Sequence, residues 1–288
     1  MPNPRANELL GYPPDARLLI VNADDFGMYH AVNAAILRTL TDGVVRSTTV
    51  MVPCPWGPHA LQLLGEHPEI AFGVHLTVAS DFVNYRWGPL TPRERVPSLV
   101  DESGSFHRNE PRQAYLAQLR LDELEIEFRA QIEAVLAANL TPTHLDWHCL
   151  RDGGRPDVFD LTLGLANEYG LALRVFDRTL IERLQGQGLP TADHEVVDST
   201  RLETPGKAAR YVQMLRELPV GLSEWAVHPG LGNAEAQAID GWWAKREADF
   251  AFLISPEARE TVRAEGIILV DYGALQAIWR RARRRPQA

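Results

Sequence analysis

Short apolar runs that end in polar residues recur along the chain, with amphipathic segments of helical period between them. The first run, residues 18–21, leads to the adjacent carboxylates Asp24 and Asp25. An apolar run of this length is typical of a parallel strand that is buried on both faces. Neighbouring residues of a regular strand point to opposite faces, so both carboxylates serve one site only where the strand turns. We expect Phe26 and Gly27 to supply that turn.

Strand and helix patterns alternate from there to the end of the chain. We expect further strands over residues 47–52, 70–77, 143–148, 171–175, 222–228 and 266–272. We expect helices over residues 29–40, 58–66, 114–140 (as one or two helices), 156–169, 208–218 and 234–265, and a closing helix that runs into the basic residues 280–285. Residues 176–204 carry no pattern that places an element firmly.

Seven or eight alternations of strand and helix predict an α/β fold, a (β/α) barrel with seven or eight parallel strands. We expect residues 1–288 to form a single domain of this kind, with its site at the carboxyl ends of the strands. Residues 78–112 interrupt the pattern with several Gly and Pro and no sustained period. We expect an irregular loop or lid there, in which Tyr85 and Trp87 are candidates for stacking on a substrate.

Composition narrows the classes of partner. The 29 Lys and Arg residues against 38 Asp and Glu residues give a net charge of −9, so we expect neither nucleic acid nor a membrane surface as a partner. No apolar stretch of membrane length and no GxGxxG or GxxxxGK[ST] motif occurs, so we expect a cytoplasmic protein that does not bind nucleotides. Cys54 and Cys149 stand in no CxxC pattern, which predicts two reduced thiols.

Histidines and carboxylates gather where the expected strands end. Besides Asp24 and Asp25, the histidines His75, His148 and His228 each stand at the end of an apolar run. Two like charges side by side in a partly buried site are costly unless they share a cation or a proton, which favours a metal beside the two aspartates. One Asp and two His from three strand ends would hold a divalent cation and leave positions open for water.

The expected strand at 143–148 carries an HxDxH pattern. His144, Asp146 and His148 lie on one face of it, because residues i, i+2 and i+4 of a strand point the same way. We favour a supporting or buried hydrogen-bonding role for His144, with metal ligation as the alternative. We expect Asp146 to orient an imidazole.

The chain resembles the YdjC-like carbohydrate deacetylase family, which is related to polysaccharide deacetylases, through five motifs in this order: LLIVNADDFG, GVHLT, THLDWH, WAVHPG and GIILVDY. The resemblance spans residues 17–273. It implies a distorted (β/α) barrel that removes acetyl groups from N-acetylated sugars, such as chitooligosaccharides, with one divalent metal ion. Whether that ion is Zn²⁺, Mg²⁺ or Mn²⁺ is left open by the residues.

The resemblance also implies roles for single residues. Asp25, His75 and His148 would be the metal ligands, Asp24 the general base and His228 the general acid. In this chemistry the metal activates the attacking water, the base takes a proton from it, and the acid protonates the amine that leaves.

Other classes of function stay open. A glycoside hydrolase would use Asp24 and Asp146 as a carboxylate pair without a metal. A metal-dependent phosphoesterase would prefer two metal ions, and a non-catalytic sugar-binding barrel would need none. The chain departs from many relatives at Cys149, where HxDxH otherwise continues with further histidines. A homodimer is expected only from the frequency of such dimers among oligomers.

Overall fold

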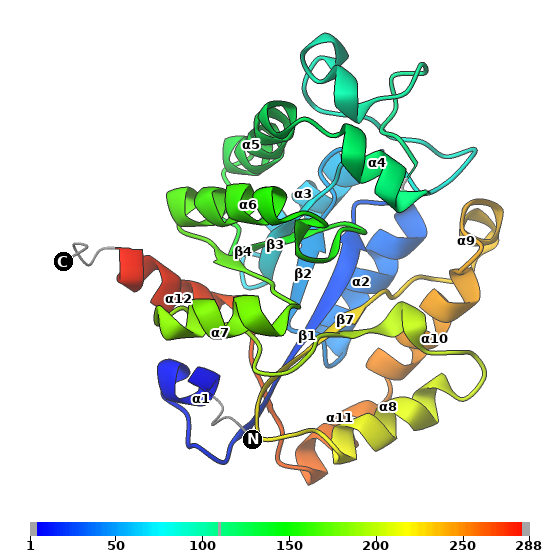
Figure 1. Cartoon of the computed structure of the whole chain (residues 1–288). Coiled ribbons are helices and arrows are strands. Elements are labelled where there is room, and N and C mark those ends of the chain that lie inside the picture. The colour runs from blue at the N-terminus through cyan, green and yellow to red at the C-terminus, as the bar shows by residue number, and fades with distance from the viewer. Residues whose placement is uncertain (1–4, 109–110, 284–288) are drawn as a thin grey trace.

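In the computed structural model, which describes residues 5–108 and 111–283, strands alternate with helices along the chain (Figure 1). The strands are β1 (Arg17–Phe26), β2 (Ser47–Val50), β3 (Ala71–Leu76), β4 (His144–Trp147), β5 (Ala172–Leu173), β6 (Val197–Asp198), β7 (Gly221–Val227) and β8 (Ile268–Leu269). The helices are α1 (Arg5–Leu10), α2 (His30–Asp42), α3 (Gly57–Glu66), α4 (Arg112–Gln118), α5 (Leu121–Ala137), α6 (Pro156–Tyr169), α7 (Arg178–Gly186), α8 (Lys207–Arg216), α9 (Ala234–Ile239), α10 (Trp243–Leu253), α11 (Pro256–Ala264) and α12 (Tyr272–Arg283). Among the described helices, none is long and apolar enough to cross a membrane.

The strands form one parallel sheet in the order β5-β4-β3-β2-β1-β7-β6, and β8 pairs with the first half of β1. Within the described residues the two edge strands, β5 and β6, do not pair with each other. The sheet is therefore a barrel that stays open between them. The predicted α/β fold, a distorted barrel of seven or eight parallel strands, is confirmed.

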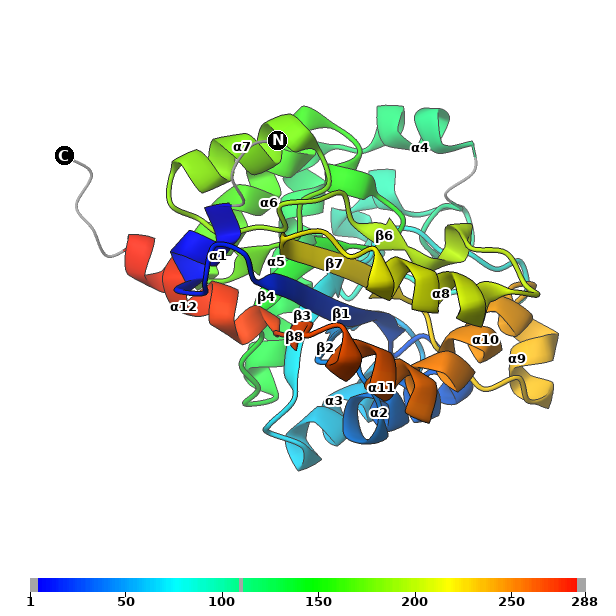
Figure 2. The same cartoon turned by 90° about the horizontal axis from the view of Figure 1, so that it is seen from below.

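β1 is the central strand of the sheet. β7 pairs with residues 17–23 on one side of it, while β8 and β2 share the other side, at residues 18–19 and from residue 22 onward. Figure 2 shows β1 in the middle, with helices all around the sheet. Residues 18–21 are at most 1% exposed, which explains why this run is continuously apolar.

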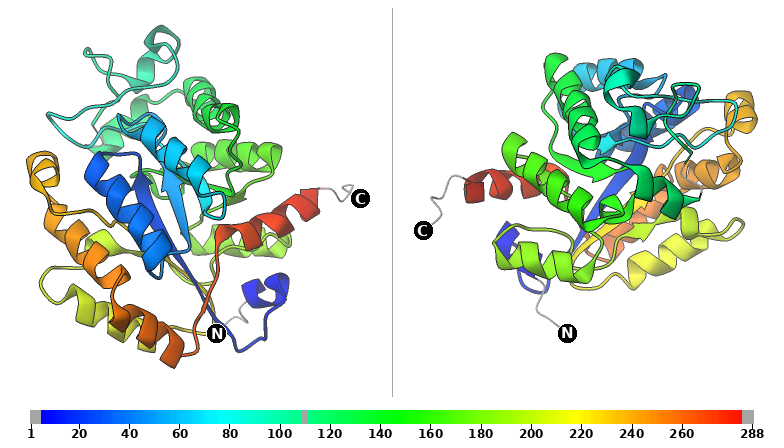
Figure 3. Two further views of the ribbon diagram at one scale, coloured as in Figure 1. Left: turned by 180° about the vertical axis from the view of Figure 1, so that it is seen from behind. Right: turned by 45° about the horizontal axis from the view of Figure 1, so that its top comes forward.

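The carboxyl ends of the strands lie under the irregular segment. Figure 1 shows α4 and the chain that precedes it at the top of the molecule, beyond the end of β1. The right-hand view in Figure 3, in which the top comes forward, shows the same segment across the strand ends. Active sites of parallel barrels lie at this end of the strands.

Most elements follow the patterns that predict them. Residues 114–140 form two helices, α4 and α5. α6 begins at Pro156 and ends where Gly170 takes a left-handed conformation with φ of 69°, as a proline at a helix start and a glycine after its end suggest. The unplaced stretch 176–204 holds α7 and the short β6. Of the expected basic helix end, residues 284–285 lie outside the described part of the chain.

The segment of residues 78–112 has little regular secondary structure. Its described part contains two 3-10 turns, η1 (Arg93–Arg95) and η2 (Pro97–Leu99), and one isolated antiparallel bridge. The buried carboxylate of Glu127 in α5 accepts hydrogen bonds from the backbone N–H groups of residues 90–91 and so ties the segment to the barrel. The function of this segment as a lid stays a prediction.

Candidate functional site

β1 brings two carboxylates to one site because its backbone turns at Asp25. This residue has a left-handed conformation with φ of 75°, and the register between β1 and β2 slips between Ala23 and Phe26. Such a conformation is uncommon outside glycine, and Asp is among the residues that tolerate it best. Asp24 and Asp25 therefore both face the site. The chain then turns at Phe26 and Gly27, as the sequence predicts. Gly27 has φ of 103°, and the backbone N–H of Met28 donates to the carbonyl oxygen of Asp25 at 3.1 Å. The left-handed conformation of Asp25 itself is not predicted.

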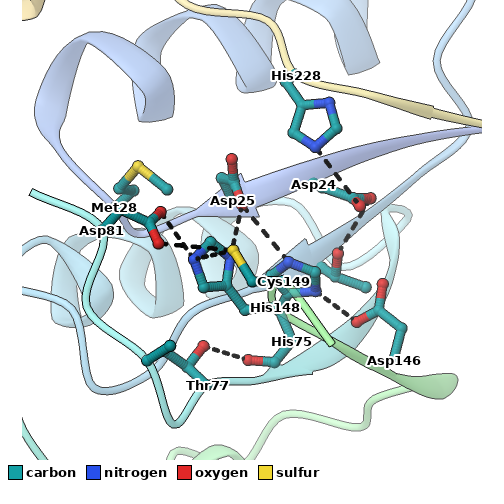
Figure 4. Close-up of polar contacts among 12 residues, drawn as sticks. Asp24, Asp25, Met28, His75, Thr77, Asp81, Asp146, His148, Cys149 and His228 are labelled. Atoms are coloured by element: carbon teal, nitrogen blue, oxygen red, sulfur yellow. Dashed lines mark hydrogen bonds and ion pairs between the residues drawn. The ribbon is translucent and has the colours of Figure 1, made fainter. Parts of the chain in front are cut away.

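Asp25, His75 and His148 converge at the ends of three strands. The Oδ1 atom of Asp25 lies 3.5 Å from His75 Nε2 and 3.3 Å from His148 Nδ1. These three potential ligand atoms all lie within 4.8 Å of one another, and all three residues are buried. Figure 4 shows both imidazole rings directed at Asp25. One oxygen and two nitrogen ligands fit a divalent cation that keeps further positions open.

The far nitrogen of His75 is held by a buried carboxylate. Its Nδ1 atom lies 2.7 Å from Asp146 Oδ1, and Asp146 is fully buried. Because a carboxylate accepts the hydrogen bond, Nδ1 is the donor, and Nε2 offers a lone pair toward Asp25 when the ring is neutral. Arg174 lies 2.6 Å from the other oxygen of Asp146. Asp146 thus orients an imidazole.

The far nitrogen of His148 is held by the irregular segment. Its Nε2 atom lies 2.8 Å from Asp81 Oδ2 and 3.3 Å from Cys149 Sγ. The thiol of Cys149 is free, as is that of Cys54, which fits the predicted reduced cysteines. Cys149 has a left-handed φ of 62°, which sets its side chain beside the histidine that precedes it. Asp81 leaves Nδ1 of His148 unprotonated toward Asp25 when the ring is neutral.

The charged residues around His75 and His148 determine whether these two rings are protonated. Burial lowers the pKa of His75, but Asp146 and Asp25 outweigh burial and raise this pKa to about 9. Burial also opposes the charged form of His148, yet Asp81, together with Cys149 and Asp25, raises its pKa well above the ordinary value. A cation that binds here must displace these protons, because only an unprotonated nitrogen is a ligand.

Arg246 of α10 compensates the charge of Asp25. Burial would raise the pKa of Asp25, but Arg246, followed by the two histidines, holds it well below the ordinary value. Arg246 Nη2 lies 2.8 Å from Asp25 Oδ2, and its Nε lies 2.6 Å from Asp240 Oδ2. One oxygen of Asp25 is therefore bound to Arg246, and the other faces the histidines.

Arg174 of the strand region after β5 holds Asp24. Its Nη1 and Nη2 atoms lie 2.7 and 2.9 Å from the two oxygens of Asp24, and its Nε lies 2.7 Å from Glu224 Oε1. Burial would raise the pKa of Asp24, but Arg174 outweighs burial and lowers it. Asp24 is therefore ionised at neutral pH. Arg174 also contacts Asp146, so it contacts three buried carboxylates in all.

His228, at the end of β7, faces Asp24. Its Nε2 atom lies 3.9 Å from Asp24 Oδ2, and its Nδ1 lies 3.0 Å from Ser199 Oγ. The Ser199 hydroxyl donates to Asp249 Oδ2 at 2.6 Å. A hydroxyl has a single proton, so the Ser199 oxygen accepts from Nδ1–H of His228. Lys207 compensates Asp249 at 2.6 Å.

His144 lies deeper in the barrel. Its ring stacks on Tyr272 at 3.6 Å between ring centroids, and its Nδ1 lies 2.9 Å from Thr143 Oγ1. Burial, followed by Arg174, lowers the pKa of His144 well below the ordinary value, so the ring is neutral. Within the described residues it belongs to none of the groups that could hold a metal ion. Its position is that of a buried, hydrogen-bonded histidine.

A cavity of about 570 Å³ opens onto this centre. Its walls include Asp24, Asp25, His75, His148 and His228, together with Trp242, which is 56% exposed. Among the described residues that line the cavity, Tyr85 and Trp87 are absent. Their rings pack against Phe82 and each other, and Trp87 is 3% exposed. The structure thus unites the five strand-end residues and leaves the two expected stacking aromatics away from the cavity.

The charged residues of the site that the sequence analysis misses include Arg174, Arg246 and Asp81. Arg174 has a signal that could find it, since it is the single charge in the apolar run 171–175. Arg246 lies in an amphipathic helix among other polar residues, and Asp81 lies in a segment without a pattern. Only the fold brings these two to the centre.

The chain is similar to proteins of one family. The family model described as YdjC-like protein matches residues 18–264. A carbohydrate deacetylase from Thermoanaerobacter pseudethanolicus is 30% identical over 262 residues, which cover 90% of this chain and 100% of that protein. A carbohydrate deacetylase from Thermus thermophilus is 34% identical over 263 residues, with 85% and 89% covered. A crystal structure from Enterococcus faecalis, of a proposed cellobiose-phosphate cleavage protein, has a TM-score of 0.79 at 30% identity and covers 90% and 99%.

Proposed function

The chain belongs to the YdjC-like protein family, and from this premise we propose that it is a carbohydrate deacetylase that removes N-acetyl groups from a sugar with a divalent metal ion. The observation that carries the proposal is the arrangement on one cavity wall. There, the buried set of Asp25, His75 and His148 lies beside the facing pair of Asp24 and His228. The names of the relatives from T. pseudethanolicus and T. thermophilus support the class of reaction.

Asp25 Oδ1, His75 Nε2 and His148 Nδ1 would hold the ion, because their spacing and chemistry fit it. When bound, a divalent cation would polarise the acetyl carbonyl and make the attacking water more acidic. Asp146 and Asp81 keep the two rings in the orientation that ligation needs. Two imidazoles with one carboxylate suit Zn²⁺, whereas Mg²⁺ would require further oxygen ligands.

Asp24 is proposed as the general base. Arg174 holds both of its oxygens and keeps the carboxylate ionised, so it can accept a proton from a water beside Asp25. The same ion pair fixes the direction of the carboxylate. Asp24 therefore needs no rearrangement before it accepts the proton.

His228 is proposed as the general acid. An amine leaves an amide only when it is protonated, and an imidazolium can supply that proton near neutral pH. Because Nδ1–H is engaged with Ser199, the proton that His228 gives is the one on Nε2. The carboxylate of Asp249 holds the Ser199 hydroxyl in place, and this hydroxyl fixes the orientation of the His228 ring.

The size of the cavity and one residue of its wall support a sugar as the substrate. Its volume of about 570 Å³ is in the range of small-molecule sites. Trp242 exposes 56% of its surface at the wall, where an aromatic face can pack against the apolar face of a sugar ring. The finer identity of the sugar is left to experiment.

The alternative of a glycoside hydrolase finds no support in the placement of its carboxylates. Asp146 is fully buried, and both it and Asp24 are bound by Arg174. Asp24 lines the cavity, but Asp146 is not among the described residues that do, so the second carboxylate cannot reach a glycosidic bond. The metal-dependent reaction is therefore the better assignment.

Acetate release from a panel of N-acetylated mono- and oligosaccharides tests the proposal. We expect release with metal, none after chelation, and a loss of both bound metal and release in Asp25→Asn. We expect His228→Ala to retain bound metal while kcat falls by about 10²- to 10⁴-fold. Asp160→Asn, which changes an exposed surface carboxylate, is the control and is expected to match the wild type. Release that survives chelation, or no release from any sugar by the metal-loaded protein, would overturn the proposal.

A further inference from the structure

His148 presents its two ring nitrogens to two different groups of ligand atoms. Nδ1 faces Asp25 at 3.3 Å. Nε2 lies 2.8 Å from Asp81 Oδ2 and 3.3 Å from Cys149 Sγ, and this sulfur lies 3.5 Å from Asp81 Oδ1. One oxygen, one nitrogen and one sulfur therefore lie within 4.8 Å of one another on the outer side of the ring.

We propose that Asp81, His148 and Cys149 form a second cation site, specific for a thiophilic divalent ion such as Zn²⁺ and distinct from the centre at Asp25. Thiolate, imidazole and carboxylate are the three ligand types of zinc sites, and a thiolate selects Zn²⁺ over ions that prefer oxygen. Mg²⁺ therefore does not bind to this set. The inference concerns a ligand that the deacetylase reaction does not require.

The surroundings of Asp81 leave it free to bind a cation. Within the described residues no Lys or Arg pairs with it, and 24% of its side chain is exposed. By contrast, the carboxylate outside His75, Asp146, is fully buried and already paired with Arg174. Among the described charged groups, the carboxylate of the second site pairs with His148 alone, whereas the corresponding place beside His75 holds a guanidinium.

The cavity gives this site an entrance and room for further ligands. Asp81, His148 and Cys149 all line the cavity wall. An ion held there would complete its coordination with water, since three protein ligands leave a fourth position of a tetrahedral site open. It would also reduce the space that a substrate enters.

Metal binding at the second site releases two protons from the protein. Binding removes the thiol proton of Cys149 and the Nε2 proton of His148, and both go to solvent. With only the second site filled, the imidazole keeps its proton on Nδ1. With both sites filled, the ring binds one ion through each nitrogen as an imidazolate. An imidazole ring keeps the two ions farther apart than the about 3.5–4 Å of two-metal hydrolases, so the second ion is no catalytic partner.

Titration of the metal-free, full-length protein with Co²⁺ tests the proposal, because a Co²⁺–thiolate bond gives a charge-transfer band in the near ultraviolet. We expect the wild type to bind two equivalents and to show this band. Cys149→Ser is expected to lose the band and one equivalent, while Asp25→Asn keeps the band and loses the other equivalent. Cys54→Ser, which changes a thiol that is 2% exposed, is the matched control and should keep both.

Two results would overturn the proposal. One is a wild type that binds a single equivalent without the band. The other is a band that disappears in Asp25→Asn as well as in Cys149→Ser, which would place the thiol in the first centre.

Alkylation of the wild-type protein gives the same answer without any substitution. Zn²⁺ is expected to slow the reaction of Cys149 with iodoacetamide by about tenfold or more, because a bound thiolate is a poor nucleophile, while Mg²⁺ leaves it unchanged. Peptide mass spectrometry reads the modified residue. Equal rates with and without Zn²⁺ would exclude the second site.

Discussion

The two histidines of the candidate metal centre are supported in opposite ways. Outside His75 lies Asp146, fully buried and bound by Arg174, which also binds two further carboxylates. We call this the closed side. Outside His148 lies Asp81, part of an irregular segment, partly exposed and accompanied by a free thiol. We call this the open side.

The two sides therefore contribute differently to stability and to the position of the metal ligands. A charge buried in the barrel is tolerated only with its partners in place, so the closed side contributes to folding as well as to the position of the ligand. A partly exposed carboxylate costs little to rearrange, so the open side positions its ligand with little effect on stability. Substitutions on the two sides should therefore affect different measurements.

Arg174→Met breaks the closed side at its centre. It leaves Asp24, Asp146 and Glu224 buried without their cation, and an uncompensated buried charge costs about 3–5 kcal/mol. We expect the free energy of unfolding, measured with urea, to fall by about that much or more. Arg93→Gln, which removes an exposed surface pair, should change it by less than about 1 kcal/mol. An Arg174→Met protein of full stability would contradict the division into two sides.

Gly73→Ala tests how tightly the closed side is packed. A Cβ at this position would lie 2.6 Å from His144 Cε1, and the stack on Tyr272 leaves that ring little room to move. We expect the free energy of unfolding to fall by about 1–3 kcal/mol, as for other overpacked cores. Gly65→Ala in α3, where a Cβ meets nothing within 4 Å, is the control. It should raise stability by up to about 1 kcal/mol, and equal effects of the two substitutions would argue against tight packing.

His144, in the same region, is expected to make the free energy of unfolding depend on pH. Its pKa in the folded protein is lowered below the ordinary value of 6.5, so the unfolded chain takes up the proton first as the pH falls. Stability is therefore expected to fall below pH 6.5, by about 1.4 kcal/mol per pH unit from this group. His144→Gln, which cannot titrate, should lack this part of the slope. Identical slopes between pH 6.5 and 5 in urea unfolding would show that the ring is protonated in the folded state.

The smallest effect concerns the affinity of the first metal centre. Asp146→Asn sets an amide NH₂ group against either His75 Nδ1–H or Arg174, which are both donors, whereas Asp81→Asn can keep its amide oxygen toward Nε2 of His148. Loss of a carboxylate behind a metal-binding histidine costs about 10- to 100-fold in affinity. We expect Asp146→Asn to weaken binding about tenfold more than Asp81→Asn, as measured by competition with a chromophoric chelator for Mn²⁺. The reverse order would assign the tighter support to the open side.

The sequence predicts the closed side better than the open side, for a physical reason. Strand periodicity places Asp146 on the face that His144 and His148 share, and the pairing of β3 with β4 sets it opposite His75. Asp24, Asp25 and His228 are found in the same way, because each stands where an apolar run ends. The alternation of strands and helices predicts the barrel by the same reasoning.

Asp81 and the left-handed conformation of Asp25 escape such reasoning. Asp81 reaches His148 across 67 residues of chain and from a segment that has no period. The left-handed backbone of Asp25 is decided by the pairing of β1 with its neighbours, which is a property of the assembled sheet. The exposure of Trp242 escapes such reasoning as well. This residue lies between the end of α9 and the start of α10, whereas its apolar side chain alone would predict burial.

Because β1 lies between three other strands, its amide hydrogen bonds are expected to open only rarely. Hydrogen bonds join β1 to β7 on one side and to β8 and β2 on the other, so its amide protons should exchange with deuterium only when the whole molecule unfolds. Asp25 stands on this strand, whereas Asp81, which holds His148, stands on a segment with few regular hydrogen bonds. Local opening at Asp81 is therefore expected to free His148 of the candidate metal centre without disturbing the strand that carries Asp25.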